Sequence, residues 1–143
     1  MPTVSPALSD LARAFLDAAR IATIATVGPD GAPHQAAIWY RLEPDDRILV
    51  NSLAGRRWPR ELEATGHCSL SIIDEADRYR WLSVEAELDE TDRDRVTACE
   101  DIVALAVRYD DYSDAGAARF RSQARVSYRL RIGGVHAELG DEP

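Results

Sequence analysis

Residues 47–64, which read RILVNSLAGRRWPRELEA, limit most strongly what this chain can fold into. The apolar residues 48–50 lie between polar neighbours and predict a short buried strand. Residues 52–55 interrupt the apolar run, and Arg56, Arg57 and Arg60 then open a predicted helix. The chain is therefore expected to pass from a strand into a helix within a few residues, with three guanidinium groups at the corner.

A corner of this kind favours an anion. The first turn of a helix has unpaired backbone N–H groups and carries the positive end of the helix dipole. Arginine adds forked N–H donors that match the oxygens of a phosphate group. The alternative is a solvated helix face with no ligand, and this stretch by itself leaves both interpretations open.

The rest of the chain predicts short antiparallel strands with a few helices between them. Apolar and β-branched residues favour strands over 21–27, 33–40, 68–73, 79–88, 125–132 and 135–139. Turn residues separate several of these strands, at 28–31, 43–46 and 133–134. Helical spacing of apolar residues predicts helices over 8–19, 91–108 and 115–123. The pattern indicates one α+β domain over residues 1–143, built around a small barrel, with residues 1–7 as a flexible tail.

Two of these segments carry more detailed expectations. Thr91 is the predicted N-cap of the helix over 91–108, whose buried stripe is expected to include Val96 and Val107. In the last strands, alternation predicts an arginine-bearing face at Arg125, Arg129 and Arg131. That face is expected either to be solvated or to meet the anionic tail of a cofactor.

Composition excludes several function classes. The net charge of −8 argues against nucleic-acid and anionic-membrane partners, because both are held by basic surfaces. All 17 basic residues are arginine, which excludes a Schiff-base or P-loop lysine. No apolar run approaches the length of a membrane-spanning helix, and charged residues interrupt positions 1–20, so we expect a cytoplasmic protein. The two cysteines, Cys68 and Cys99, are expected to be small buried hydrophobic residues.

Three stretches together resemble one known family. Residues 25–34 read ATVGPDGAPH, and residues 80–86 read RWLSVEA. Between them, residues 51–62 contain Asn51-Ser52, Gly55-Arg56, Arg60 and Leu62. These stretches resemble the pyridoxamine-phosphate-oxidase-like split β-barrel superfamily, in its branch that uses the deazaflavin coenzyme F420. The resemblance extends over nearly the whole chain, from residue 8 to residue 138.

The resemblance implies a split β-barrel homodimer that transfers a hydride from reduced F420 to an activated C=C or C=N bond of a small organic substrate. It implies that the cofactor's ring and tail are bound by Ile38, Trp39, Asn51, Ser52, Arg56, Arg57 and Arg60, with Trp81 or Tyr79 offered to the partner's cofactor. No catalytic side chain is identified, because the ring itself carries the reactivity. A metal site is not expected, because no histidine accompanies the acidic residues 89–94.

The sequence departs from the family pattern at two positions. Trp58 stands where the family has a lysine, and Glu61 stands where it has an asparagine. Arg57 could then bind the phosphate in place of the lysine. FMN becomes an alternative cofactor, because a guanidinium group can bind a ribityl phosphate whichever ring is attached to it. A second alternative is a non-catalytic dimer that binds an apolar small molecule, since a carboxylate at position 61 would repel an anion. His34 is expected to be a structural hydrogen-bonding residue.

Overall fold

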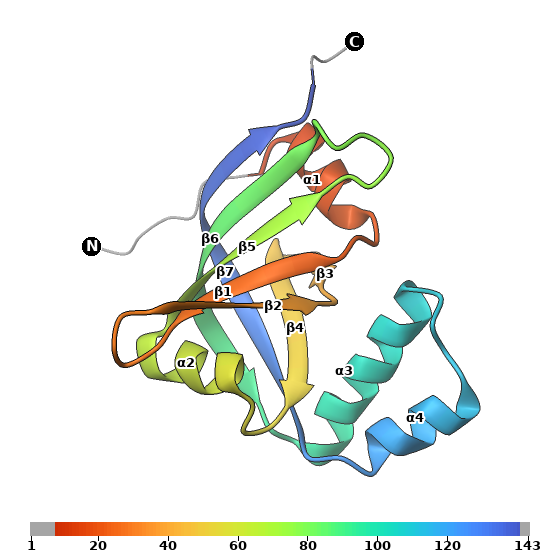
Figure 1. Cartoon of the computed structure of the whole chain (residues 1–143). Coiled ribbons are helices and arrows are strands. Elements are labelled where there is room, and N and C mark those ends of the chain that lie inside the picture. Colours follow the sequence, from red (N-terminus) through yellow and green to blue (C-terminus); the bar gives the residue numbers. More distant parts are fainter. Residues whose placement is uncertain (1–7, 141–143) are drawn as a thin grey trace.

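The computed structural model describes residues 8–140, so the tail predicted over residues 1–7 lies outside the described part. Seven antiparallel strands form one curled sheet in the order β2-β1-β5-β6-β7-β4-β3 (Figure 1). The strands are β1 (Ala22–Val27), β2 (Pro33–Ile38), β3 (Arg41–Leu42), β4 (Arg47–Leu53), β5 (His67–Ile73), β6 (Trp81–Asp92) and β7 (Arg125–Glu138). The helices are α1 (Asp10–Asp17), α2 (Arg57–Thr65), α3 (Arg95–Arg108) and α4 (Asp114–Arg121). This is the predicted α+β split β-barrel.

The curled sheet encloses the main hydrophobic core. Alternate residues of each strand point inward, and Ile24, Leu70 and Val84 are fully buried there. Helices α1 and α2 add Leu16 and Leu62 to the same core. Apolar residues recur at every second position in the strands and at every third or fourth position in the helices. The fold removes these residues from water.

Helix α3 covers part of the sheet's opposite face. Leu49 and Asn51 alternate with the inward-facing residues of β4, yet both are buried, because α3 packs over β4 and β7. Ala98, Ile102 and Leu105 form the side of α3 that is removed from water. Figure 1 shows α3 and α4 together beside the β4 and β7 end of the sheet.

Hydrogen bonds join the C-terminal end of α3 to neighbouring segments of the chain. Arg108 donates from Nε to the Tyr40 carbonyl at 2.9 Å and from Nη1 to the Asp17 carbonyl at 2.9 Å. Its neighbour Tyr109 accepts from the Tyr40 N–H at 3.2 Å. The same helix end is thus joined both to the segment that follows α1 and to the segment that follows β2.

The start of α3 differs from the prediction. The helix begins at Arg95 with Asp94 as its N-cap, whose Oδ1 accepts from the Val96 and Thr97 N–H groups at 3.0 Å. Thr91 is instead part of β6, opposite Tyr128 of β7, because the pairing of β6 with β7 continues to Asp92. The predicted buried stripe was wrong at both ends, where Val96 is 70% and Val107 60% exposed.

The last strand also differs from the prediction. Gly133 and Gly134 were expected to bend the chain between two strands, but β7 runs through them without ending. The register with β6 shifts by one residue between Glu85 and Ala86, opposite this glycine pair. A bulge, which the small glycines permit, therefore takes the place of the predicted turn.

Two further expectations concern single features. Cys68 and Cys99 are both free and buried, as predicted, and burial raises the pKa of the Cys68 thiol to about 12. Within residues 8–140, no helix is both long enough and apolar enough to cross a bilayer.

We predict that Asp94→Ala lowers the urea midpoint of unfolding more than Thr91→Ala does, because only Asp94 caps α3. Hydrogen bonds from the Thr97 backbone and side chain and the Val96 N–H hold the pKa of Asp94 below its ordinary value. Its contribution is therefore present at neutral pH and lost as the pH falls through that lowered pKa. Urea melts at pH 7 and at pH 3 would test this, and an equal or larger effect of Thr91→Ala would contradict it.

Candidate functional site

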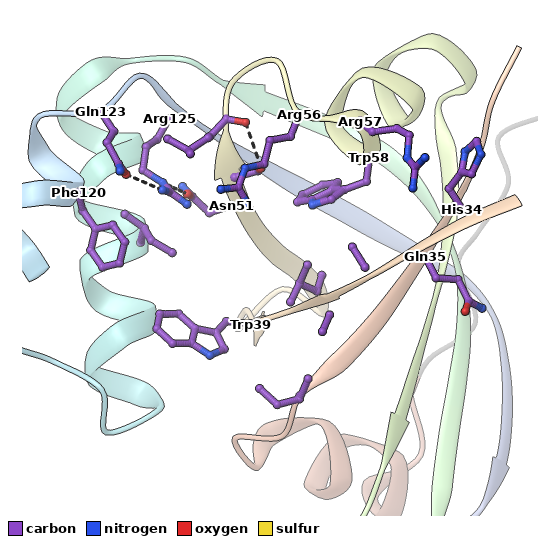
Figure 2. Close-up of a pocket in the computed structure, with 17 residues that line it drawn as sticks. His34, Gln35, Trp39, Asn51, Arg56, Arg57, Trp58, Phe120, Gln123 and Arg125 are labelled. Carbon is purple, nitrogen blue, oxygen red and sulfur yellow. Dashed lines mark hydrogen bonds between the residues drawn. The ribbon is translucent and has the colours of Figure 1, made fainter.

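One hollow of the molecule lies where four parts of the fold meet. It has a volume of about 610 Å³ and is bounded by β2, the end of β4 with the start of α2, the start of β7, and the helices α3 and α4 (Figure 2). We call it the corner pocket. Its volume lies within the range of small-molecule and cofactor sites.

One end of the corner pocket is cationic. Arg56, Arg57 and Arg125 line it, and no aspartate or glutamate does. Within residues 8–140, none of these three arginines forms a salt bridge. In a chain of net charge −8, three arginines without carboxylate partners in one pocket leave a concentrated positive field for an anion.

The start of α2 adds backbone donors to that end. Its N-cap residue, Arg56, makes no capping hydrogen bond with its side chain. The N–H groups of the first turn are therefore available to a ligand or to water, and Pro59 in that turn has none to satisfy. The predicted strand-to-helix corner is confirmed as a structure, with its positive helix end at the pocket.

The other end of the pocket is apolar. Ile38, Ala36 and Trp39 line it from β2 and the residue after it, and Ile102 lines it from α3, while Phe120 of α4 lies at the cationic end beside Arg125. One face of Trp39 stacks on Tyr109, with ring centroids 5.3 Å apart and planes 12° apart. The pocket thus combines an apolar part with a cationic end, a polarity that suits an organic ligand with an anionic group.

Asn51 and Ser52 line the pocket as predicted, but their side chains have partners inside the protein. Asn51 donates to the Ala98 carbonyl at 2.8 Å and to Ser127 Oγ at 2.9 Å. Its Oδ1 accepts from Arg125 Nε at 2.8 Å. Ser52 Oγ donates to the Leu53 carbonyl at 3.0 Å, and the residue is only 2% exposed.

The structure does not bring two other candidates into the pocket. Arg60, one turn further along α2, lines a neighbouring hollow together with Arg57, Glu61 and residues of the β1–β2 turn. Trp81, at the start of β6, does not line the corner pocket of its own chain.

Glu61 does not face the corner pocket. Its Oε1 accepts from Thr26 Oγ1 at 2.9 Å, and its Oε2 lies 2.8 Å from His34 Nδ1. Burial raises the pKa of Glu61, but the hydrogen bonds from Thr26 and His34 and the charge of Arg57 outweigh it, so the pKa lies below its ordinary value. The carboxylate is held by the β1–β2 hairpin, and His34 is the hydrogen-bonding residue that was expected.

Trp58, at the family's lysine position, is a core residue. It is 8% exposed and contacts Tyr128 edge to face, with ring centroids 5.9 Å apart. Arg57, the residue directly before Trp58, lines the pocket. Figure 2 shows Arg57 between Trp58 and His34 at the edge of the pocket.

Arg125 is the site residue that sequence reasoning placed least well. The alternation of the last strand predicted an arginine-bearing face. That face was expected either to be solvated or to meet the anionic tail of a cofactor. The structure places Arg125 at the pocket and the other two arginines of that face in ion pairs, Arg129 with Glu43 and Arg131 with Glu87. Only the pairing of β7 with β4 puts Arg125 beside Asn51, and no local signal predicts that contact.

No group of three metal-ligating side chains gathers anywhere in the described range, residues 8–140. The arginine-lined pocket is therefore the feature of this fold that most strongly indicates a ligand.

Comparison with known proteins agrees with the fold. The family model described as pyridoxamine 5'-phosphate oxidase matches residues 8–136. A reduced-F420-dependent biliverdin reductase of Mycobacterium tuberculosis is 30% identical over 86 residues, which cover 59% of this chain and 61% of the relative. The match thus spans less than two thirds of that relative's length.

Two solved structures are similar in fold. A protein named F420 reductase has a TM-score of 0.75 at 24% identity, over 87% of this chain and 94% of its own. A conserved hypothetical protein of Mycobacterium tuberculosis has a TM-score of 0.73 at 24% identity, over 94% of this chain and 89% of its own. The family match over residues 8–136, with this shared split β-barrel, shows that the chain belongs to the pyridoxamine 5'-phosphate oxidase family.

Proposed function

We propose that this protein is an F420-dependent oxidoreductase that reduces an activated C=C or C=N bond of a small organic substrate. The observation that carries the proposal is the corner pocket, in which Arg56, Arg57 and Arg125 meet without a carboxylate. The relative named as a reduced-F420-dependent biliverdin reductase supports the choice of cofactor and of reaction class.

The residues of the pocket fit such a cofactor. Arg56 and Arg57, with the N–H groups at the start of α2, would hold the phosphate. Ile38 and Trp39 would lie along the ring system, at the apolar end. When bound in reduced form, the deazaflavin supplies the hydride, and a proton completes the reduction of the substrate bond.

The protein's own contribution is position and exclusion of water. The stack of Trp39 on Tyr109 fixes the apolar wall, and α3 and α4 cover the side of the pocket that would otherwise open to solvent. A bound ring and a substrate above it would be held in one orientation, which raises the rate of transfer without a nucleophilic side chain. Within residues 8–140, the side chains of this kind that line the pocket are Ser52, whose hydroxyl donates to the Leu53 carbonyl, and His34, whose Nδ1 is bonded to Glu61.

We further propose that two copies of the chain associate through the outer face of β1, β2, β5 and β6. One row across this face consists of small or short side chains, in the order Ala37, Thr23, Ser71 and Ser83, and continues to His136 of β7. Val27, Ile73 and Trp81 are exposed on the same sheet, at 42%, 48% and 36%. A face of short side chains with exposed apolar side chains beside them suits a close sheet contact, and a second copy would be needed to bring Trp81 to a cofactor.

FMN remains the alternative cofactor, because the arginines would grip its phosphate equally well. A non-catalytic binding dimer is the second alternative. The main argument for it, a carboxylate at position 61 that would repel an anion, is weakened. Glu61, which was expected to repel an anion, is held by Thr26 and His34 beside a different hollow.

We predict that Arg57→Ala raises the Kd for F420 about tenfold, the loss expected for one charge-assisted hydrogen-bonding pair. Titration of the visible absorption of F420, and separately of FMN, would measure this. Arg78→Ala is the matched control, because Arg78 lies in the loop between β5 and β6 and lines none of the hollows described above. Unchanged affinity in Arg57→Ala would refute the role of Arg57, and failure of the wild type to bind either cofactor would favour the binding module.

We predict that Ser71→Arg converts a dimer into a folded monomer, because a long charged side chain in the small-residue row prevents close contact of two sheets. Light scattering during size-exclusion chromatography would give the mass. Ala118→Arg, on the exposed side of α4, is the control and should leave the mass unchanged. A wild-type monomer, or a dimer that survives Ser71→Arg, would show that this face is not the interface.

A further inference from the structure

Arg125, at the start of β7, is the least exposed of the three arginines at the corner pocket. Its guanidinium group has five N–H donors. Nε donates to Asn51 Oδ1 at 2.8 Å, and Nη1 donates to Gln123 Oε1 at 2.7 Å. Two donors are used in this way, and the three others have no protein partner within residues 8–140. A half-buried cation with free donors at a pocket is arranged to bind an acceptor.

A chain of polar side chains lies behind Arg125. Asn51 accepts from Arg125 and donates to Ser127 Oγ at 2.9 Å. Ser127 Oγ in turn donates to Asp101 Oδ2 at 2.7 Å. Every hydrogen bond runs in the same direction, from the guanidinium group to the carboxylate. Bonds that point the same way polarise one another and strengthen the whole chain.

The contacts permit only one orientation of the Asn51 amide. Its NH₂ group faces two acceptors, the Ala98 carbonyl and Ser127 Oγ, while its oxygen faces the Arg125 Nε–H. Rotation of the amide by half a turn would set an NH₂ group against the guanidinium donor and an oxygen against the Ala98 carbonyl. Both Asn51 and Ser127 are buried, at 7% and 0% exposure, so the arrangement has little freedom.

The carboxylate at the end of the chain is separated from Arg125 by two side chains. A direct ion pair would occupy the planar fork of the guanidinium group, which is the part that binds a phosphate. Here two neutral amides, of Asn51 and Gln123, hold one donor each, and the carboxylate of Asp101 lies further away on α3, 3.9 Å from Arg129. The chain therefore fixes the direction of Arg125 without neutralising it.

The geometry points to Arg125 as a third phosphate-binding arginine of the corner pocket, with Asn51, Ser127 and Asp101 as its positioning residues. This inference rests on the proposed function, since it takes the cofactor's phosphate as the anion. It also assigns Asn51 a different role from the one implied by the family resemblance. Asn51 directs Arg125 and does not itself reach the cofactor.

The charges at the pocket agree with this assignment. Burial, and then the positive charge of Arg56, lower the pKa of Arg125 to about 10. Two arginines that repel each other at the entrance to a cavity are both stabilised by an anion placed between them. Phe120 lies under the Arg125 guanidinium, 5.2 Å from ring centroid to Cζ, and supports it from the side of α4.

The test is a comparison of two ligands that differ only in the anionic tail. The Kd of F420 and that of its deazaflavin chromophore without the phosphate tail are measured for wild type, Arg125→Gln, Asn51→Ala and Ser127→Ala. The ratio of the two values isolates the contribution of the tail, because damage to the fold affects both ligands alike. FMN and riboflavin form a second pair of the same design.

We expect Arg125→Gln to raise the ratio of the F420 Kd to the Kd of the phosphate-free chromophore about tenfold, and Asn51→Ala and Ser127→Ala to raise it about threefold, with little change for the phosphate-free ligand. Ser127→Thr, which keeps the hydroxyl group, should restore the wild-type ratio, and Arg78→Gln should leave it unchanged. If Asn51→Ala does not fold, Arg125→Gln and Ser127→Ala still carry the test.

The wild type is expected to bind the ligand with the phosphate tail more tightly than the ligand without it. If this preference persists in Arg125→Gln, the inference is overturned and the proposed function stays intact. If the wild type binds neither pair, or binds both members of a pair equally, the proposed function itself fails. A loss in Arg125→Gln without any loss in the Asn51 and Ser127 variants would keep Arg125 as a ligand and remove its positioning chain.

Discussion

The attachment of α3 to the outer face of β4 and β7 is the interaction on which the pocket depends. A split barrel without this helix would expose Leu49 and Asn51 to water and would leave the end of β4 open on one side. Buried apolar contacts of Ile102 and Leu105 hold the middle of the helix. Arg108 and Tyr109 bind its end to backbone carbonyls of Asp17, Arg20 and Tyr40. The helix thus closes the cavity while its polar side supplies Asp101.

Charge is distributed unevenly over the molecule, and the distribution gives the pocket its character. Most arginines away from the pocket lie next to carboxylates, as Arg47 does beside Asp45, Asp89 and Glu90. Exposed pairs of this kind contribute little to stability, but they neutralise the cations elsewhere on the surface. The arginines at the corner pocket differ because no carboxylate lines the pocket with them: Glu61 is held by His34, although the charge of Arg57 still lowers its pKa, and Glu63 is held by Arg93 and Tyr128. The pocket therefore has an excess of positive charge.

Much of the fold was predictable because local patterns agreed with it. The turn at residues 28–31 joins β1 to β2 as expected, and the apolar residues 48–50 form the buried middle of β4. The errors arose where a long-range contact outweighed a local signal. Thr91 resembles an N-cap, yet the pairing of β6 with β7 extends past it, and Gly133–Gly134 resembles a turn, yet the pairing of β7 with β6 continues through it as a bulge.

The candidate site was predictable in part for the same reason. Arg56 and Arg57 lie at the pocket because the strand-to-helix corner is a local feature, whereas Arg60 follows the turn of α2 into a neighbouring hollow. Arg125 is 68 residues or more from the other two in the chain, and its place depends on the pairing of β4 with β7.

The sequence by itself determined the family, the strand-to-helix corner and the excess of arginine at that corner, since each follows from residues close together in the chain. Only the tertiary structure decided which arginines share one cavity, that Glu61 is directed away from it, and that Asn51 binds Arg125. The physical reason is that a side chain's hydrogen-bond partners depend on which strands and helices pack side by side, and that packing is set by burial of the whole apolar core.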